Sequence, residues 1–391
     1  MRVLYIADEL TQSGAIKSFE EVVVTMKERF GVDAIVCTSG HSSLNDRLNA
    51  KGIQTIESCY ASAMQNSPIT WWKVPAKYIL CGLKYYTKRK LAIELIEKSV
   101  DFSTIDLIHT NVNRIDIGVE LAEKYHVPNI MHIREFGDAD FKCWSYRREY
   151  LQYLNKNVTH FIAISKAVKD SWVSRGLSEH KVSVIYNGVA SNMIKSADFK
   201  RMLTDEIMRM VIVGGVIPNK GQIQAIQAIG LLPEQIRTKV TLDIIGWSSK
   251  QYFDIIESEI QKHGLNKQIH VLGAQNNIYE RLQDYHVGLM CSKAEGFGRV
   301  TAEYMHAGLG VIASDCGANP ELIQNEKTGL LYNKVDTTSL TQKIMKYYQN
   351  RELLISCARD GQRFAKNTFT QEINARYIYC LYNEILGKEM E

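Results

Sequence analysis

The sequence predicts an α/β protein with two doubly wound parallel sheets that follow one another along the chain. Short apolar runs of strand length alternate with longer patterns of helical period through both halves. A polar stretch over about residues 190–205 interrupts this alternation once, and the same pattern then starts again. The chain has 391 residues, which suits two domains of ordinary size.

In the first half, strand-like runs are separated by helical patterns such as Ser18–Phe30 and Arg114–Tyr125. These runs are Val3–Ile6, Ala34–Cys37, Leu107–His109, Asn129–His132, Phe161–Ile164 and Val182–Ile185. We therefore expect a first Rossmann-like domain over residues 1–190.

The second half repeats the alternation after the polar stretch. Its strand-like runs are Met210–Val213, Val240–Ile245, Ile269–Leu272, Val287–Met290, Val311–Ala313 and Leu330–Tyr332. We expect a second Rossmann-like domain over residues 205–370. A last helix, about Gln371–Leu386, follows the completed sheet, and residues 371–391 are treated as a separate terminal segment.

Composition is typical of a soluble enzyme, with 45% hydrophobic and 23% charged residues. A net charge of +4 is too small to indicate a nucleic-acid partner. The eight cysteines form no CxxC pair and have no metal-binding spacing, which favours reduced thiols. Because the chain opens on a strand and has no long apolar run, we expect no signal peptide, no membrane span and a cytoplasmic location.

The most informative segment reads AEGFGRVTAEYMHAG and spans residues 294–308. It lies between the buried strand-like runs His286–Ser292 and Gly310–Asp315, so it occupies the carboxyl end of a strand and the start of a helix. Gly296 and Gly298 let the backbone approach a ligand closely. The first helical turn, from Phe297 through Arg299 and Val300, presents free N–H groups that suit a diphosphate.

Glu295 and Glu303 flank this turn. Carboxylates that faced the anion would repel it, so we expect them to accept hydrogen bonds from hydroxyls of a sugar and of a ribose. This pattern indicates a nucleotide-sugar. The alternative is that Glu295 ends a loop and that Glu303 lies on a solvated helix face.

Several segments in a fixed order then resemble the retaining GT-B glycosyltransferases of family 4, which have a glycogen-synthase-like architecture. The shared features are the two glutamates with seven residues between them, SDCGANPELI, GLLY, FIAISKAVKDSWVSRG, VIYNGV and VGGVIPNKG. The resemblance covers most of the chain. It implies two domains facing a cleft, the first binding the acceptor and the second the nucleotide-sugar, with the terminal helix packing back on the first domain.

The resemblance implies that Lys220, in VGGVIPNKG, stabilises the diphosphate as a point charge. Family members usually carry an arginine where this chain has Gly215, so one cation is missing. Arg299 and Arg134 are candidate substitutes, and a surface arginine is the alternative for each. The nucleobase is expected near Leu272–Asn277.

On the first domain, the resemblance places His132 close to the donor sugar, and a satisfied core histidine is the alternative reading. Gly14 lies in the first strand-to-helix turn, where a backbone amide can approach a phosphate or sugar. Family members often have two glycines there, and Ser13 replaces one. Asp138 and Asp140 form a DxD that could hold a metal, but the family typically works without one, and we expect no metal and no cofactor.

Residues 71–90 read WWKVPAKYILCGLKYYTKRK and contain six basic residues and no acidic one. Interleaved aromatic and basic residues are typical of helices at an anionic membrane surface, which would suit a lipid-linked acceptor on the inner face of the cell membrane. A helix packed on the first sheet with a solvated basic face is an equal alternative. An RNA-binding patch is disfavoured because no RNA-binding module accompanies it.

The function expected from these features is retaining transfer of a hexosyl group from a nucleoside-diphosphate sugar to a glycan or lipid-linked saccharide, in cell-surface polysaccharide or glycoconjugate biosynthesis. His132, Lys220 and Glu295 are the expected catalytic residues. A non-catalytic GT-B subunit that recruits a partner transferase is the main alternative. A nicotinamide-dependent dehydrogenase is disfavoured because ADELTQSGA, after the first strand, lacks the GxGxxG turn.

Overall fold

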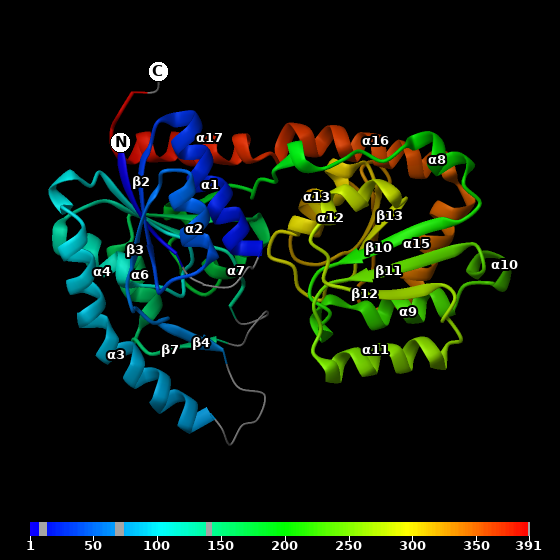
Figure 1. Cartoon of the computed structure of the whole chain (residues 1–391), viewed down its shortest axis with the longest axis horizontal. Helices are drawn as coiled ribbons and strands as arrows, with labels where there is room; N and C mark the ends of the chain where they lie inside the picture. The colour runs from blue at the N-terminus through cyan, green and yellow to red at the C-terminus, as the bar shows by residue number, and fades with distance from the viewer. Residues whose placement is uncertain (8–13, 67–73, 138–142, 390–391) are drawn as a thin grey trace. The chain divides into compact units, whose positions relative to one another are not determined.

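The computed structural model describes residues 1–7, 14–66, 74–137 and 143–389. The chain forms two compact units: unit 1 comprises Met1–Gly188 with Gln371–Glu391, and unit 2 comprises Val189–Thr370. Each unit has its own parallel sheet with helices on both faces (Figure 1). The predicted α/β class with two Rossmann-like sheets is confirmed.

Unit 1 has a parallel sheet with strand order β3-β2-β1-β5-β6-β8-β9 among its described residues. The strands are β1 (Arg2–Ile6), β2 (Asp33–Thr38), β3 (Gln54–Glu57), β5 (Leu107–Thr110), β6 (Asn129–Ile133), β8 (His160–Ala163) and β9 (Val182–Val184). A small antiparallel pair joins β4 (Met64–Asn66) to β7 (Cys143–Ser145). All of the runs predicted in this half are strands.

Strand β3 and the β4–β7 pair were not predicted. Strand β3 reads QTIE, and Ile56 is its one aliphatic residue. The strand lies at the edge of the sheet and buries few side chains, so it needs few apolar residues. Its place in the sheet comes from backbone pairing with β2. An edge strand of this kind carries almost no hydrophobic signal in the sequence.

Side chains that alternate along β1 pack against two different layers of helices. Val3 and Tyr5 contribute to the core under α1 (Gly14–Phe30) and α17 (Gln371–Ile385), whereas Leu4 and Ile6 contribute to the core on the other face. Figure 1 shows α1 beside α17, with α3 and α4 across the sheet. The remaining helices of unit 1 are α2 (Ser43–Ala50), α3 (Val74–Ser99), α4 (Ile117–Tyr125), α6 (Tyr150–Asn157) and α7 (Lys166–Val173).

Unit 2 has a parallel sheet with strand order β12-β11-β10-β13-β14-β15. The strands are β10 (Met208–Val213), β11 (Val240–Ile245), β12 (Ile269–Gly273), β13 (Val287–Met290), β14 (Gly310–Ser314) and β15 (Leu330–Tyr332). Each matches a predicted run. Apolar side chains from each strand, such as Leu242 and Leu289, are buried in one core cluster.

Two of the longer helices of unit 2 begin at a capping side chain. Ser249 caps α11 by accepting from Tyr252 N, and Asp336 caps α15 by accepting from Thr338 N. The helices are α8 (Phe199–Thr204), α9 (Gln222–Gly230), α10 (Glu234–Arg237), α11 (Lys250–Lys262), α12 (Ile278–Arg281), α13 (Arg299–Ala307), α14 (Asn319–Leu322), α15 (Thr337–Gln349) and α16 (Arg351–Thr368). Figure 1 draws α9 and α11 on one side of the sheet and α13 and α16 on the other.

Candidate active site

The sheet of unit 2 has a topological switch point between β10 and β13. From β10 the chain continues to β11 and β12 on one side, whereas β13, β14 and β15 lie on the other. Such a reversal leaves a crevice at the carboxyl ends of the two strands, where open α/β sheets bind ligands. The loops that leave these two strands carry Lys220 and Glu295, and this topology therefore brings the two residues to the same edge of the sheet.

A close backbone contact holds the two loops together. Lys293 N donates to Asn219 O at 2.9 Å. Gly221 adopts φ 72°, and a Cβ atom there would lie 2.0 Å from Cys291 O, so no larger residue fits. The glycine that follows Lys220 is thus required for the approach that sets the position of this lysine.

The side chains of Lys220 and Glu295 form an ion pair. Lys220 Nζ lies 2.8 Å from Glu295 Oε2, and the backbone N–H of Gly298 donates to Glu295 Oε1 at 3.2 Å. Gly298 has φ 85° and is the N-cap of α13. The ammonium and amide groups predicted to hold a diphosphate therefore both bind the Glu295 carboxylate.

The backbone of Glu295 is also fixed in place. Ala318 N donates to Glu295 O at 2.9 Å, and a Cβ at Gly317 would lie 2.1 Å from that same oxygen. Gly317 belongs to the SDCGANPELI motif, so the structure explains this glycine by its packing against the Glu295 peptide. Phe297 is 3% exposed and its ring packs edge-on against Phe369, which anchors the turn from Gly296 to Val300.

Glu303 is 6% exposed and is held by two donors. Its Oε1 accepts from Tyr279 Oη at 2.8 Å and from Arg299 Nε at 3.0 Å. Burial, followed by the nearby Glu303 charge, raises the pKa of Tyr279, so its hydroxyl stays protonated and donates. Both bonds use the same carboxylate oxygen, Oε1.

The two arginines considered as substitutes for the missing cation have defined contacts. Arg299 also donates to Tyr279 Oη at 3.3 Å, so its guanidinium lies against Glu303 and Tyr279. Arg134, 8% exposed, donates to the Asn111 carbonyl and side chain and to Asn187 Oδ1. Neither arginine is exposed at the surface, which was the alternative for both.

Gly215, where the family resemblance leads us to expect an arginine, has room for a side chain. A Cβ built there meets no atom within 4 Å, and its backbone φ is not in the left-handed region. Its neighbour Gly214 adopts φ 139° and lies against Gly246, where a Cβ would be 1.8 Å from Gly214 O. The loop after β10 is therefore tightly packed at Gly214 and open at Gly215.

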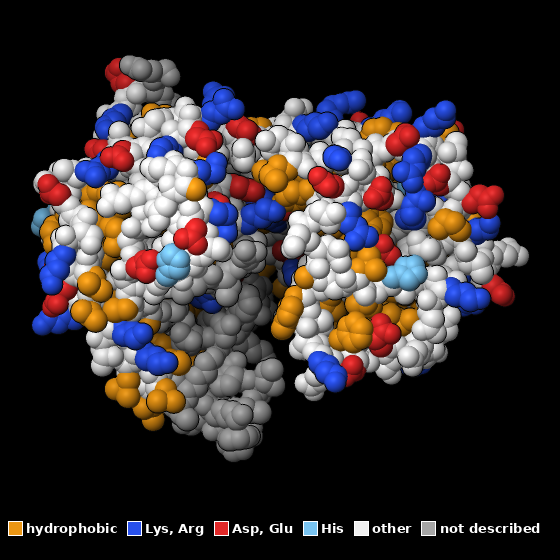
Figure 2. Space-filling model, viewed as in Figure 1, with side chains coloured by type: hydrophobic (Ala, Val, Ile, Leu, Met, Phe, Trp, Pro, Cys, Tyr) orange, Lys and Arg blue, Asp and Glu red, His pale blue; other side chains and the backbone are white. Residues whose placement is uncertain are grey.

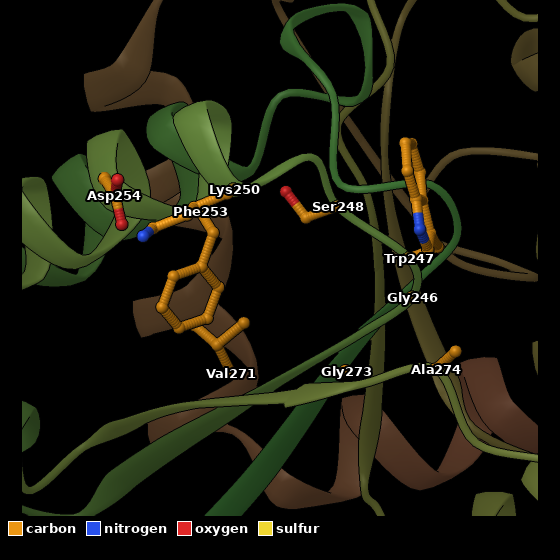
Figure 3. Close-up of a pocket in the computed structure, with 9 residues that line it drawn as sticks. All are labelled: Gly246, Trp247, Ser248, Lys250, Phe253, Asp254, Val271, Gly273 and Ala274. Atoms are coloured by element: carbon orange, nitrogen blue, oxygen red, sulfur yellow. The ribbon is translucent and has the colours of Figure 1, made fainter.

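A pocket of about 530 Å³ opens at the carboxyl ends of β11 and β12. Its lining residues are Gly246, Trp247, Ser248, Lys250, Phe253, Asp254, Val271, Gly273 and Ala274. Figure 3 shows the Phe253 ring above Val271 on one side and the Trp247 indole on the other, with Ser248 between them. Trp247 is 67% exposed, which is unusual for an indole without a partner surface.

In unit 1, His132 lies on β6 and is 1% exposed. Its Nδ1 is 2.6 Å from Nε2 of His109 on β5, whereas its Nε2 is buried without a hydrogen-bond partner among the described residues. Burial, and then the charge of Arg134, lowers the pKa of His132, so the ring is neutral. Gly14 is exposed at the first position of α1, and Ser13 lies outside the described residues.

No group of three or more His, Cys, Asp or Glu side chains in the described part of the chain could hold a metal ion. Asp138 and Asp140 fall outside that part.

Helix α3 carries much of the basic segment predicted to meet a membrane, whose residues 71–73 fall in the undescribed range. Leu80, Leu83 and Leu91 are 62%, 57% and 51% exposed, and Lys84 and Lys88 are exposed between them. Figure 2 shows orange and blue side chains mixed where Figure 1 draws this helix. No helix in the described ranges is long and apolar enough to cross a bilayer.

Arg89 does not belong to that exposed basic surface. Its guanidinium pairs with Asp116 at 2.7 Å and with Glu120, and its side chain is 13% exposed. Arg89 points inward because Asp116, which precedes α4, is fully buried and needs a cation.

The structure adds residues that the sequence did not single out. Tyr279 positions Glu303, Gly317 fits the Glu295 backbone, and His109 contacts His132. Trp247 lines the pocket. Gly317 stands inside a quoted motif and Tyr279 follows the predicted nucleobase loop, so weak signals existed, whereas a single histidine or tryptophan carries none.

Comparison with known families supports one assignment over both units. The family described as Glycosyltransferase Family 4 matches residues 28–192, and the family described as Glycosyl transferases group 1 matches residues 196–364. The second match includes Lys220, Glu295 and Glu303.

Among curated proteins, the chain is 22% identical over 384 residues to the capsular polysaccharide biosynthesis glycosyltransferase CapH of Staphylococcus aureus, covering 97% of this chain and 99% of that protein. It is 30% identical over 168 residues to the lipopolysaccharide core biosynthesis mannosyltransferase LpcC of Rhizobium leguminosarum bv. viciae, covering 41% and 46%.

Among solved structures, Anabaena HepE in complex with UDP superposes with a TM-score of 0.79 at 20% identity, covering 97% of this chain and 99% of that one. This likeness concerns the fold, which is the GT-B arrangement of two Rossmann-like domains. From the family matches and the fold together, the chain belongs to the GT-B glycosyltransferases of group 1 and family 4.

Proposed function

We propose that this glycosyltransferase moves a sugar from a nucleoside-diphosphate sugar to a saccharide acceptor with retention of anomeric configuration. The observation that supports this most is the convergence of Lys220, Glu295 and the start of α13 at the β10/β13 switch point. A cation beside the open start of a helix suits a diphosphate. Glu303, further along the same helix, suits a ribose.

In the proposed reaction the anomeric carbon loses its bond to the diphosphate oxygen and gains one to the acceptor oxygen. Lys220 and the amides near Gly298 stabilise the negative charge of the departing diphosphate. That phosphate oxygen takes the proton of the acceptor hydroxyl. The acceptor therefore attacks the same face of the sugar from which the diphosphate leaves. Glu295 accepts from hydroxyls of the sugar once the diphosphate has taken over Lys220.

We assign the nucleobase to the pocket beside Trp247. The pocket lies at the carboxyl ends of β11 and β12. Ala274, one of its lining residues, comes four residues before helix α12, on which Tyr279 holds Glu303, the predicted ribose contact. An exposed indole offers a flat apolar face for stacking, worth roughly 1–3 kcal/mol per base in nucleic-acid-binding proteins. The nucleobase was expected at Leu272–Asn277, and Gly273 and Ala274 line this pocket.

The names of the relatives support a role in cell-surface polysaccharide assembly. CapH is described as acting in capsular polysaccharide biosynthesis and LpcC in lipopolysaccharide core biosynthesis, and HepE was solved with UDP. A uridine diphosphate sugar and a glycan acceptor are therefore the first pair to test.

The test of the function is transfer by the purified full-length chain. Thermal shifts against UDP, GDP and ADP select the nucleotide, and the matching sugar is then offered with oligosaccharide acceptors while NMR reads the anomeric configuration of the product. Activity should survive EDTA, because Lys220 and helix amides replace a metal. Donor binding without hydrolysis or transfer would favour the non-catalytic subunit, and an inverted product would contradict retention.

Glu303→Ala should weaken nucleotide binding by roughly 1.5–3 kcal/mol, because a ribose hydroxyl loses a charged acceptor. Tyr279→Phe should weaken it less, since the carboxylate remains but loses one of the two donors that orient it. Calorimetry with the free nucleoside diphosphate measures both. Equal affinity of Glu303→Ala and the parent would remove Glu303 from the site.

We further propose that the exposed face of α3 contacts an anionic membrane that presents a lipid-linked acceptor. Leu80, Lys84, Lys88 and Leu91 follow one another three to four residues apart, so both kinds of side chain share one face. Apolar side chains can enter the interface while the lysines meet acidic headgroups.

Changing Lys84, Lys88 and Lys90 together to glutamine should weaken binding to vesicles with acidic lipid by about a hundredfold, since each lysine near the surface contributes about 1 kcal/mol. Arg89 is left unchanged because it holds Asp116. A control changes the exposed lysines Lys267, Lys327 and Lys366 of unit 2. Co-sedimentation measures binding, and equal binding to neutral and acidic vesicles would return α3 to a packed helix with a solvated face.

A further inference from the structure

A row of hydrogen-bonded rings runs through the core of unit 1 to His132. Tyr382, on the last helix α17, contacts Nδ1 of His109, and Nε2 of His109 lies 2.6 Å from Nδ1 of His132. The two imidazoles stack with centroids 4.7 Å apart. All three side chains are at most 1% exposed. The row ends at His132 Nε2, which has no partner among the described residues.

Protons in this row are not independent of one another. Burial lowers the pKa of His109 to about 3 and also lowers that of His132, so both rings are neutral near pH 7 and each carries one N–H. The contact between the rings needs one donor and one acceptor. A proton placed on one nitrogen of the row therefore decides which nitrogen is protonated in both histidines.

Two proton arrangements satisfy the contacts. In the first, Tyr382 donates to His109 Nδ1, His109 Nε2–H donates to His132 Nδ1, and His132 carries its proton on Nε2. In the second, every bond is reversed, and the Tyr382 proton must go to Tyr5 Oη, which is 3.4 Å away. A bond of that length is weak. A phenol is also a better donor than an imidazole and an imidazole nitrogen a better acceptor than a phenol oxygen, so the first arrangement is favoured.

We infer that Tyr382 and His109 are positioning residues that hold His132 in the Nε2–H tautomer, so that His132 donates a hydrogen bond to a hydroxyl oxygen of the donor sugar. The role of the sugar rests on the proposed function, whereas the tautomer does not. Helix α17, at the end of the chain, thus determines the tautomer of His132 on β6. Keeping the buried Nε2–H of His132 without a partner costs free energy.

The direct test is ¹⁵N NMR of the full-length protein labelled at histidine, because the two ring nitrogens report which one is protonated. The parent should show both histidines protonated at Nε2. Tyr382→Phe keeps the ring volume but removes the donor to His109, so the His132 tautomer should shift or become mixed. The matched control is Tyr5→Phe, which removes a hydroxyl at the weak end of the row and should change nothing.

Variants of His109 separate positioning from packing. His109→Gln retains a donor for His132 and an acceptor for Tyr382, so it should preserve the tautomer and the rate. His109→Leu fills similar space without either group, and kcat should fall about tenfold, as expected for one lost hydrogen bond, with the affinity for free nucleoside diphosphate unchanged. Thermal unfolding checks that each variant is folded.

A parent protein with His132 protonated at Nδ1 would overturn the inference, as would a Tyr382→Phe variant with an unchanged His132 tautomer. Equal kcat for His109→Leu and His109→Gln would remove the positioning role. If the parent transfers no sugar at all, the NMR result still decides the tautomer, and the failure then belongs to the proposed function alone.

Discussion

Replacing Lys220 with alanine should lower the transfer rate by on the order of a hundredfold or more, the usual effect of removing one group that stabilises charge in a transition state. The effect should be large because Gly215 stands where the family resemblance leads us to expect a second cation. Steady-state kinetics with saturating acceptor measures the loss. Lys267→Ala, at an exposed position elsewhere in unit 2, is the control and should have no effect.

The same site offers a rescue experiment. A side chain at Gly215 meets no atom within 4 Å of its Cβ and needs no unusual backbone angle, so Gly215→Arg should fold normally. It should raise the rate of the parent and recover part of the activity of Lys220→Ala, because it supplies a cation to the same leaving group. A Lys220→Ala variant that keeps full activity would show that the helix start of α13 stabilises the diphosphate without the lysine.

Glu295→Gln should tighten the binding of nucleoside diphosphate and lower the turnover rate. The carboxylate now holds both Lys220 Nζ and Gly298 N–H, which a diphosphate also needs. Removing one competing ion pair, worth up to about 1 kcal/mol, should tighten binding of free nucleoside diphosphate by roughly fivefold. Turnover should fall roughly ten- to a hundredfold, because sugar hydroxyls lose a charged acceptor in the transition state.

Calorimetry and single-turnover kinetics on the same preparation measure the two effects of Glu295→Gln, and Glu352→Gln on the exposed face of α16 is the control. Weaker binding of the nucleoside diphosphate by Glu295→Gln would mean that the carboxylate orients Lys220 for the anion and does not compete with it. Unchanged turnover would remove the sugar contact from Glu295.

The ion pair between Lys220 and Glu295 shows where prediction from the sequence stops. The sequence identified both residues and the strands that precede them, because each follows a buried apolar run with a glycine-rich turn. It assigned Lys220 to the diphosphate and Glu295 to the sugar as separate contacts. Their direct pairing depends on the β10/β13 switch point, which joins segments that are 75 residues apart.

The sequence by itself determined the α/β class, the strands of both sheets except β3 and the β4–β7 pair, and the family, because these depend on hydrophobic period and on motifs that each occupy a short stretch of chain. Only the tertiary structure decided what depends on contacts between distant segments. Tyr382 reaches His109 across 273 residues, Tyr279 reaches Glu303, and Arg89 turns inward to a buried Asp116. Which side chains pair depends on how the elements pack and on the need to give buried polar groups a hydrogen-bond partner. Neither produces a periodic pattern in the sequence.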